Sequence, residues 1–314
     1  MIYVSIPVHT SIPTILNQIE NIQRRLYSHI VLHVSANADF SKQELVRSLT
    51  EKKYSQPVTV NPISVSTAWG GIIKAHLENI KFIGTLTNEP KAKVVFHASN
   101  DMIVKEGLTE YLEGKKNLFN LRYIDRPGHW WPGNLALKDF RLTRTLAKLG
   151  SGRVIASQIE GSMYPLSLLK SISDLIEQEN LLDSDLFYPR EEIFFPSIAY
   201  AFGERPESDP YVFSEVHRFD YVNWKVWNKV EKICPNMFRD FTKKLTNFLL
   251  FRSKFYKIRI EDVSAVRNNL IKPLDLRDGD NNFFLYKDPA IIFGVKRVGL
   301  SLDDPIRQAI NKLD

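Results

Sequence analysis

Glu191 and Glu192 are the two adjacent carboxylates best suited to acid–base chemistry in this sequence. Inverting sugar transfer needs one carboxylate to take the proton from the attacking hydroxyl, and cations to hold the departing diphosphate. If no metal is used, Lys296 and Arg297, with Arg277 upstream, can supply that positive charge. A purely structural role is the alternative for the glutamates, because carboxylates are stabilised in the first turn of a helix such as the one expected at 193–202.

Asp101 is a second candidate, because it follows an apolar β-branched run at 94–96 and a small polar cluster that includes Asn100. Ligands bind beyond the carboxyl ends of the strands in α/β sheets, so Asp101 is expected in a pocket wall, accepting hydrogen bonds from ligand hydroxyls. A lone carboxylate is a weak site for a divalent ion.

Metal-binding patterns are poorly represented. There is no H-E-x-x-H or C-x-x-C, and the D-x-D pairs at 183–185 and 278–280 do not directly follow a buried strand. The sequence therefore predicts no metal and no resident cofactor.

Trp130 and Trp131 lie in a Pro/Gly-rich stretch at 126–133, which is expected to be an exposed loop. Stacking on a sugar ring and plugging the domain surface are both open readings. The basic, aromatic-rich segment 237–260 is similarly open, since it can lie on an anionic membrane or pack on the domain.

The elements that must position these residues alternate between strands and helices. Buried strands are expected at 2–8, 29–34, 58–65 and 94–97, another strand at 118–122, and helices at 12–22, 42–50 and 71–86. This order favours an α/β fold with a mainly parallel sheet flanked by helices, although no dinucleotide-binding or P-loop glycine motif is present. We expect a catalytic core at 1–205 and a mostly helical C-terminal extension at 206–314.

The bulk composition fits a folded protein with an anionic partner. The 314 residues carry a net charge of +6, which favours a phosphorylated ligand, an acidic membrane surface or nucleic acid. No nucleic-acid-binding module is recognisable, so we do not expect nucleic acid to be a partner. Cys234 is the only cysteine, and neither a signal sequence nor a long apolar run is seen, which predicts a cytoplasmic location.

Several segments together resemble the core-2/I-branching β-1,6-N-acetylglucosaminyltransferases and peptide O-xylosyltransferases, which are metal-independent inverting enzymes of the GT-A type. The resemblance covers roughly residues 2–202, and more faintly the remainder. The segments that carry it are His33-Val34-Ser35, Val65–Trp69, His97–Ile103, Gly161–Ser167, Tyr188–Ser197 and Phe293–Lys296.

This resemblance implies that Glu192 is the general base and that Lys296 contacts the leaving diphosphate. Arg277 and Arg297 are added as further cations for the diphosphate, although no family motif fixes them. The same segments imply that Ser35 lies beside the nucleotide and that Asp101, Asn100, Trp69, Gly161, Ser162 and Glu191 lie beside the sugar or acceptor. We also expect Pro7 and Val8, at the end of the first strand, beside the nucleotide. Departures from the family pattern are Ser35 in place of an aspartate, and Arg190-Glu191 in place of Pro-Asp. The family's cysteines and membrane anchor are also missing.

The hypothesis from sequence is a bacterial enzyme that moves a sugar of the GlcNAc or xylose class from a UDP-sugar to a glycan hydroxyl, in capsule, lipopolysaccharide or other surface-polysaccharide synthesis. It would act in the cytoplasm, with peripheral contact to the inner membrane and a lipid-linked glycan as one form of acceptor. Two alternatives stay open: a metal-dependent D-x-D transferase, and a non-catalytic protein that binds glycans or nucleic acid on an α/β fold.

Overall fold

The structure is a computed structural model that describes every residue except 129, 219, 223–224, 227–256, 279–280 and 314. Its main sheet has five strands in the order β3-β2-β1-β4-β8. These strands are β1 (Ile2–Val8), β2 (His29–Val34), β3 (Val58–Val60), β4 (Lys93–Phe96) and β8 (Met163–Pro165). The first four run parallel, and β8 pairs antiparallel with β4 at the edge.

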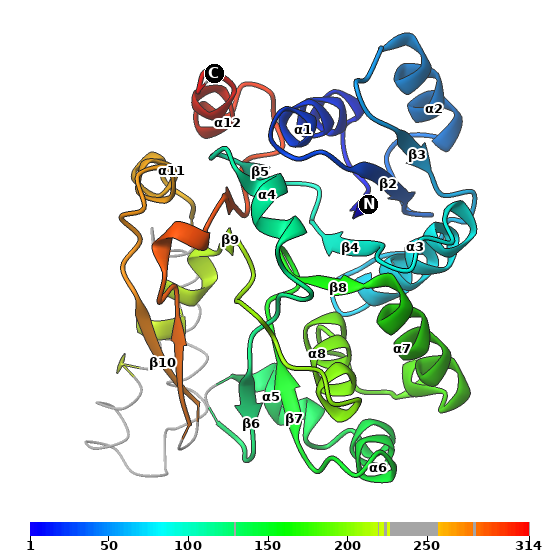
Figure 1. Cartoon of the computed structure of the whole chain (residues 1–314), viewed down its shortest axis with the longest axis vertical. Helices are drawn as coiled ribbons and strands as arrows, with labels where there is room; N and C mark the ends of the chain where they lie inside the picture. The colour runs from blue at the N-terminus through cyan, green and yellow to red at the C-terminus, as the bar shows by residue number, and fades with distance from the viewer. Residues whose placement is uncertain (129, 219, 223–224, 227–256, 279–280, 314) are drawn as a thin grey trace.

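Alternate residues of the strands face two separate hydrophobic layers, as the period of a strand requires. On one side Val4, Ile6 and Leu32 pack against α1 (Ile12–Arg25), and on the other Val31 and Phe96 pack against α3 (Ile72–Leu86), α7 (Leu166–Gln178) and α8 (Glu191–Ala201). Helices therefore cover both faces of the sheet (Figure 1). The α/β class with a mostly parallel sheet is confirmed.

A second, three-stranded sheet joins distant parts of the chain. Its order is β5-β12-β9, where β5 is Met102–Ile103, β12 is Gly294–Val295 and β9 is Val212–Phe213. β12 runs antiparallel to β5 and parallel to β9. Because β5 follows β4 directly, this sheet brings residues after 205 to the carboxyl edge of the main sheet.

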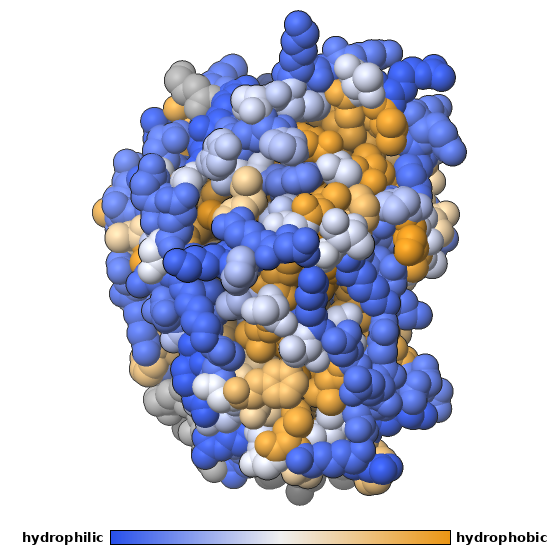
Figure 2. Space-filling model, turned by 45° about the vertical axis from the view of Figure 1, so that its right-hand side comes forward, coloured by the Kyte–Doolittle hydropathy of each residue, from blue (hydrophilic) through white to orange (hydrophobic). Residues whose placement is uncertain are grey.

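The remaining elements surround these sheets. They are α2 (Lys42–Glu51), α4 (Leu108–Glu113), β6 (Arg122–Ile124), α5 (Trp131–Ala136), α6 (Phe140–Lys148), β7 (Val154–Ala156), α11 (Ile260–Arg267), β10 (Leu274–Asp278), β11 (Asn281–Leu285), α12 (Pro305–Asn311) and the short 3-10 turns η1 (Leu181–Asp183) and η3 (Pro289–Ile291). The described part of 206–314 therefore contains the strands β9 to β12 in addition to the helices α11 and α12. On the face shown in Figure 2, hydrophobic residues gather in patches bordered by hydrophilic ones.

Three elements differ most clearly from the sequence expectation. The strand expected at 58–65 ends at Val60, because the Asn61 side chain accepts a hydrogen bond from the Ile63 amide and turns the chain. The expected strand at 118–122 becomes β6, which begins only at Arg122. The expected loop at 126–133 gives way to α5 at Trp131, where Pro132 fits the first helical turn.

No helix within the described ranges is long and apolar enough to cross a bilayer. Of the basic segment 237–260, residues 237–256 lie outside the described residues, as does Cys234.

Candidate active site

A pocket of about 170 Å³ opens at the carboxyl ends of β1 and β4. This is the edge where α/β sheets bind ligands. Pro7 and His9 come from the end of β1, and His97, Ala98 and Ser99 from the end of β4. The rest of the wall comes from three other segments: Thr67, Ala68, Trp69, Ile72 and His76 around the start of α3, Ile159 and Glu160 after β7, and Glu191 at the start of α8. The wall is thus largely apolar with a few polar groups, which is typical of a small-molecule site.

Asp101 supports this wall from behind and is not among the residues that line the pocket. It is fully buried, its Oδ2 accepts a hydrogen bond from the Ala98 amide at 2.8 Å, and the same oxygen lies 3.4 Å from Nδ1 of His97. The opposite ring nitrogen of His97 is hydrogen-bonded to the Tyr211 hydroxyl. Asp101 thus fixes the turn that carries the pocket residues 97–99.

Glu191 and Glu192 lie in the first turn of α8, where burial raises the pKa of both carboxyls toward neutral pH. Burial raises the pKa of Glu191 to about 8, and the neighbouring charge of Glu192 adds to the shift. Burial also raises the pKa of Glu192, to about 7, while the positive charge of Lys296 opposes the rise. Glu191 is the one of the two that lines the pocket. Buried carboxyls whose pKa values are raised toward neutrality beside a cation are typical of acid–base sites.

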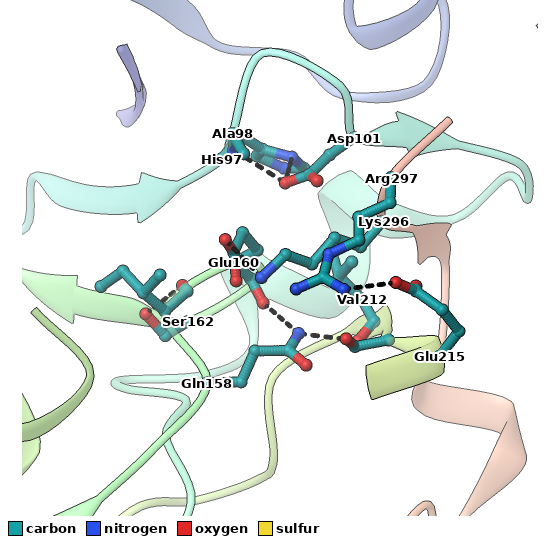
Figure 3. Close-up of polar contacts among 12 residues, drawn as sticks. His97, Ala98, Asp101, Gln158, Glu160, Ser162, Val212, Glu215, Lys296 and Arg297 are labelled. Atoms are coloured by element: carbon teal, nitrogen blue, oxygen red, sulfur yellow. Dashed lines mark hydrogen bonds and ion pairs between the residues drawn. The ribbon is translucent and has the colours of Figure 1, made fainter. Parts of the chain in front are cut away.

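Lys296 is held against the pocket wall by Glu160. Its Nζ lies 2.7 Å from Oε1 of Glu160, and both side chains are about nine-tenths buried. Burial alone would lower the pKa of Lys296, but the negative charge of Glu160 and then Glu192 outweighs it and the pKa is raised. The ammonium group is therefore charged. Figure 3 shows the two side chains pointing toward one another between His97 and Gln158.

The backbone around this pair explains its position. Lys296 follows β12, and its amide donates to the Phe213 carbonyl at 2.9 Å, which extends the β12–β9 pairing. Glu160 precedes Gly161, which has a φ of +79°. A Cβ at Gly161 would lie 2.7 Å from the Val212 backbone nitrogen, so the chain approaches β9 here as only glycine allows.

Arg297 forms a second ion pair beside the first. Its Nη1 lies 3.0 Å from Oε1 of Glu215, which is fully buried (Figure 3). Burial raises the pKa of Glu215, and the charge of Arg297 opposes that rise. Arg297 has a φ of +63°, in the left-handed region that costs energy for a residue with a Cβ. Such backbone conformations often mark functional sites.

Gln158 and His217 support Glu160 from outside the pocket, and neither is among the residues that line it. Nε2 of Gln158 donates to the carbonyls of Glu160 and Val212 at 2.7 and 2.9 Å, and its Oε1 is hydrogen-bonded to Nε2 of His217 at 2.9 Å. Burial and, to a smaller extent, the charge of Arg122 lower the pKa of His217 to about 3. His217 is therefore neutral at physiological pH.

Three aromatic rings gather beside the pocket, and one of them, Trp69, belongs to its wall. The Trp69 ring lies 5.2 Å from Trp131 and 5.3 Å from Phe187, centroid to centroid. These side chains are 49, 49 and 56% exposed, respectively. Trp130, by contrast, is partly buried, with the Arg122 guanidinium 4.5 Å from its ring centroid. The two tryptophans therefore differ in environment. Trp130 packs on the domain, whereas Trp131 faces solvent and is available for stacking.

The other predicted residues are backbone or support positions. Val8 and Ser35 are joined by a backbone hydrogen bond, and the Ser35 hydroxyl accepts from the Thr67 amide, which carries the segment before Trp69. The Asn100 carbonyl accepts from Val298, and the buried Ser162 hydroxyl donates to Ile159. Arg277 lies on β10, opposite Asn282, and its side chain is outside the described part of the structure.

Several site residues were missed from sequence: Arg122, Gln158, Glu160, Phe187, Glu215 and His217. Glu160 and Glu215 each follow closely after a short apolar run, at 154–156 and 212–213, as Asp101 does after 94–96. That signal was available, but these runs are only two or three residues long and do not stand out as strands.

Among the residues that the structure describes, no group of three or more His, Cys, Asp or Glu side chains is arranged to hold a metal ion. No protein-family model and no curated protein matches the chain.

Proposed function

We propose that this protein is an inverting glycosyltransferase of the GT-A type, which moves a sugar of the GlcNAc or xylose class from a UDP-sugar to a glycan hydroxyl. The observation that supports the proposal is the pair Glu160–Lys296 beside Glu191 and Glu192, where Glu160 and Glu191 line one pocket and Glu192, the next residue of α8, lies within the electrostatic influence of Lys296. Acidic groups that titrate near neutrality and a buried cation thus meet at the sheet edge where nucleotides commonly bind.

Glu192 is proposed as the general base. Its pKa of about 7 leaves a substantial ionised fraction at neutral pH, and a base is most effective when its pKa is near the working pH. Glu191, with a pKa of about 8, is mostly protonated under the same conditions. It then serves as a hydrogen-bond donor from the pocket wall.

In the proposed reaction, Glu192 accepts the proton of the acceptor hydroxyl as that oxygen attacks the anomeric carbon. The bond from this carbon to the diphosphate oxygen breaks in the same displacement, so the configuration inverts. The electron pair leaves with UDP, and Lys296 and Arg297 stabilise its negative charge. The nucleoside would lie on the Pro7, Val8 and Ser35 side of the pocket.

The biological setting proposed is bacterial surface-polysaccharide synthesis, such as capsule or lipopolysaccharide, in the cytoplasm or peripherally at the inner membrane. It is supported by the family resemblance and by the net charge of +6, which favours anionic ligands and surfaces.

The first experiment is a thermal-shift screen of the full chain with UDP, GDP and CMP, because a ligand of the folded state raises its stability. UDP is expected to give the largest shift. Transfer assays with UDP-GlcNAc and UDP-xylose then compare wild type with Glu192→Gln, which should keep UDP binding and lose about 10²–10⁴-fold in turnover. Glu110→Gln, an exposed change on α4, is the matched control.

Two outcomes would overturn parts of the proposal. Near-wild-type turnover of Glu192→Gln, together with an inactive Glu191→Gln, would move the base to Glu191. A chain that binds no nucleotide and still binds oligosaccharides is a glycan-binding protein, a function that the exposed aromatic rings around Trp69 would also support.

A further inference from the structure

We infer that Trp69, Trp131 and Phe187 form a platform on which one sugar ring of an oligosaccharide acceptor stacks, so that the acceptor extends beyond the pocket. The role of this oligosaccharide as an acceptor rests on the proposed function, whereas its binding to the three rings does not. We call these three residues the aromatic platform.

The platform is assembled from three distant segments. Trp69 precedes α3, Trp131 begins α5, and Phe187 lies in the connection before α8. Their centroid separations of 5.2 and 5.3 Å are those of aromatic contacts, yet about half of each side chain remains exposed. Large exposed apolar groups that converge at a pocket indicate a binding surface, whereas single exposed ones do not.

The local backbone holds the rings in place without burying them. Gly70 has a φ of +80°, and a Cβ there would lie 3.0 Å from two carbons of the Phe187 ring, so this ring rests directly on the glycine backbone. Next to Trp131, the Trp130 ring packs over Gly133, where a Cβ would lie 2.9 Å from it. The platform is therefore built before any ligand arrives, which reduces the entropy lost on binding.

The pocket beside the platform supplies the polar part of the recognition. Trp69 belongs to both, and the pocket wall also contains Glu160 and Glu191. Oε2 of each glutamate is buried and has no hydrogen-bond partner in the described structure. Buried carboxyl oxygens are costly when unpaired, so these two atoms fit the hydroxyl groups of a ligand.

A carbohydrate suits this combination better than the other occupants of an aromatic surface. Sugar rings present an apolar C–H face for the platform and hydroxyls for the glutamates. A phosphate or carboxylate headgroup of a lipid would offer neither an apolar ring face to the platform nor a hydroxyl group to the buried oxygens of Glu160 and Glu191. A pocket of about 170 Å³ exceeds by roughly tenfold the space one water needs, so it holds a ring-sized group beside the platform.

The experiment titrates the full chain with cello-, chito-, malto- and xylo-trisaccharides, by saturation-transfer NMR and calorimetry. Trp131→Ala and Phe187→Ala should each weaken the best trisaccharide roughly tenfold, the order of one lost stacking contact. Trp131→Phe keeps a ring and should stay within about threefold of wild type on the same reasoning. Phe140→Ala, which removes a ring that is 71% exposed on α6 outside the platform, should change nothing.

Each remaining outcome decides the question. Failure of wild type to bind any of the four trisaccharides overturns the platform, even if UDP shifts the melting temperature. Equal binding by wild type and both alanine variants overturns it as well, and so does loss of binding in Trp131→Phe equal to that in Trp131→Ala. Trisaccharide binding that follows the rings, in a chain that binds no nucleotide, keeps the platform and rejects the transferase.

Discussion

Lys296 and Glu160 meet in an ion pair of 2.7 Å although they follow strands that belong to different sheets. The cation proposed to hold the diphosphate is therefore already neutralised by a carboxylate of the chain. An incoming diphosphate must compete with Glu160 for the same ammonium group. Since both partners are about nine-tenths buried, the contact affects stability as well as binding.

Lys296→Met should abolish most of the affinity for UDP while sparing that for uridine, which has no phosphate. The loss expected is about 2–5 kcal/mol, because a desolvated charge contact is removed. Calorimetric titration with UDP and uridine measures both. Lys287→Met, at an exposed lysine, is the control, and an unchanged UDP affinity in Lys296→Met would remove this residue from the diphosphate site.

The same substitution should destabilise the fold, because Glu160 is left buried without its partner. The cost is about 3–5 kcal/mol in the free energy of unfolding. Lys296→Met combined with Glu160→Gln should recover most of that loss without recovering UDP binding. Denaturant unfolding of the two singles and the double completes the cycle, and simple additivity would show that the two residues are not coupled.

The pH profile of kcat/KM should be bell-shaped. Glu192, with a pKa raised to about 7, must be ionised, so the rate should fall about tenfold per pH unit below 7. Glu191, with a pKa raised to about 8, must be protonated in its proposed role, so the rate should fall again above 8. Profiles of kcat/KM measure this, and Glu191→Gln should lose the alkaline limb only. A flat profile between pH 5 and 9 would contradict both assignments. Because the two carboxyls interact, the two limbs report the apparent pKa values of the pair.

Stability should also respond to Glu191. Its pKa rises from 4.5 to about 8 on folding, so between these values the native state holds more protons than the unfolded state. Stability from this group is therefore present below about pH 4.5 and is lost as pH rises through about 8. Glu191→Gln should melt higher than wild type at pH 8, by about 2–4 °C for each kcal/mol recovered. At pH 4 the two should melt together.

Gly161→Ala should be much more damaging than Gly203→Ala. Both glycines have a positive φ, of +79° and +87°, but only Gly161 has the Val212 backbone within 2.7 Å of a built Cβ. Gly203→Ala should cost about 1–2 kcal/mol from the left-handed backbone alone. Gly161→Ala must also push β9 away from the Glu160 segment, so it should lose more stability and more UDP affinity. Similar losses in the two variants would show that the close approach is unimportant.

Chelation should leave transfer unaffected. The proposed site uses Lys296 and Arg297 to stabilise the leaving group, so added EDTA should leave the rate unchanged at constant ionic strength. The measurement compares dialysed enzyme with EDTA, and with added magnesium or manganese. Strict dependence on manganese would favour a metal-dependent D-x-D transferase instead.

Much of the fold could be predicted from local pattern. The runs that became β1, β2 and β4 are apolar because both faces of these strands are covered, and α1 and α3 follow the helical period in their buried residues. The alternation of these elements was enough to predict a parallel sheet. β3 was predicted too long, since the turn at Asn61 depends on one side-chain hydrogen bond.

The site was less accessible to the same reasoning. Its ion pairs depend on β9 and β12, which are two residues each and whose parallel pairing joins Val212 to Gly294 and Phe213 to Val295. Continuing that register places Ser214 beside Lys296 and Glu215 beside Arg297. A pattern within either segment does not specify its partner across the sheet. Asp101 illustrates the reverse case, since its position was predicted but its side chain turns inward to His97 and Ala98.

The three-stranded sheet has a consequence for biosynthesis. β5 and β9 are translated well before β12, yet β12 lies between them and carries the two cations of the site. During translation, the nascent chain therefore has the glutamates and the aromatic platform before it has Lys296 and Arg297. A ribosome-bound chain that has not yet reached β12 is consequently unable to hold a nucleotide diphosphate by this pair, and binding competence arrives late in synthesis.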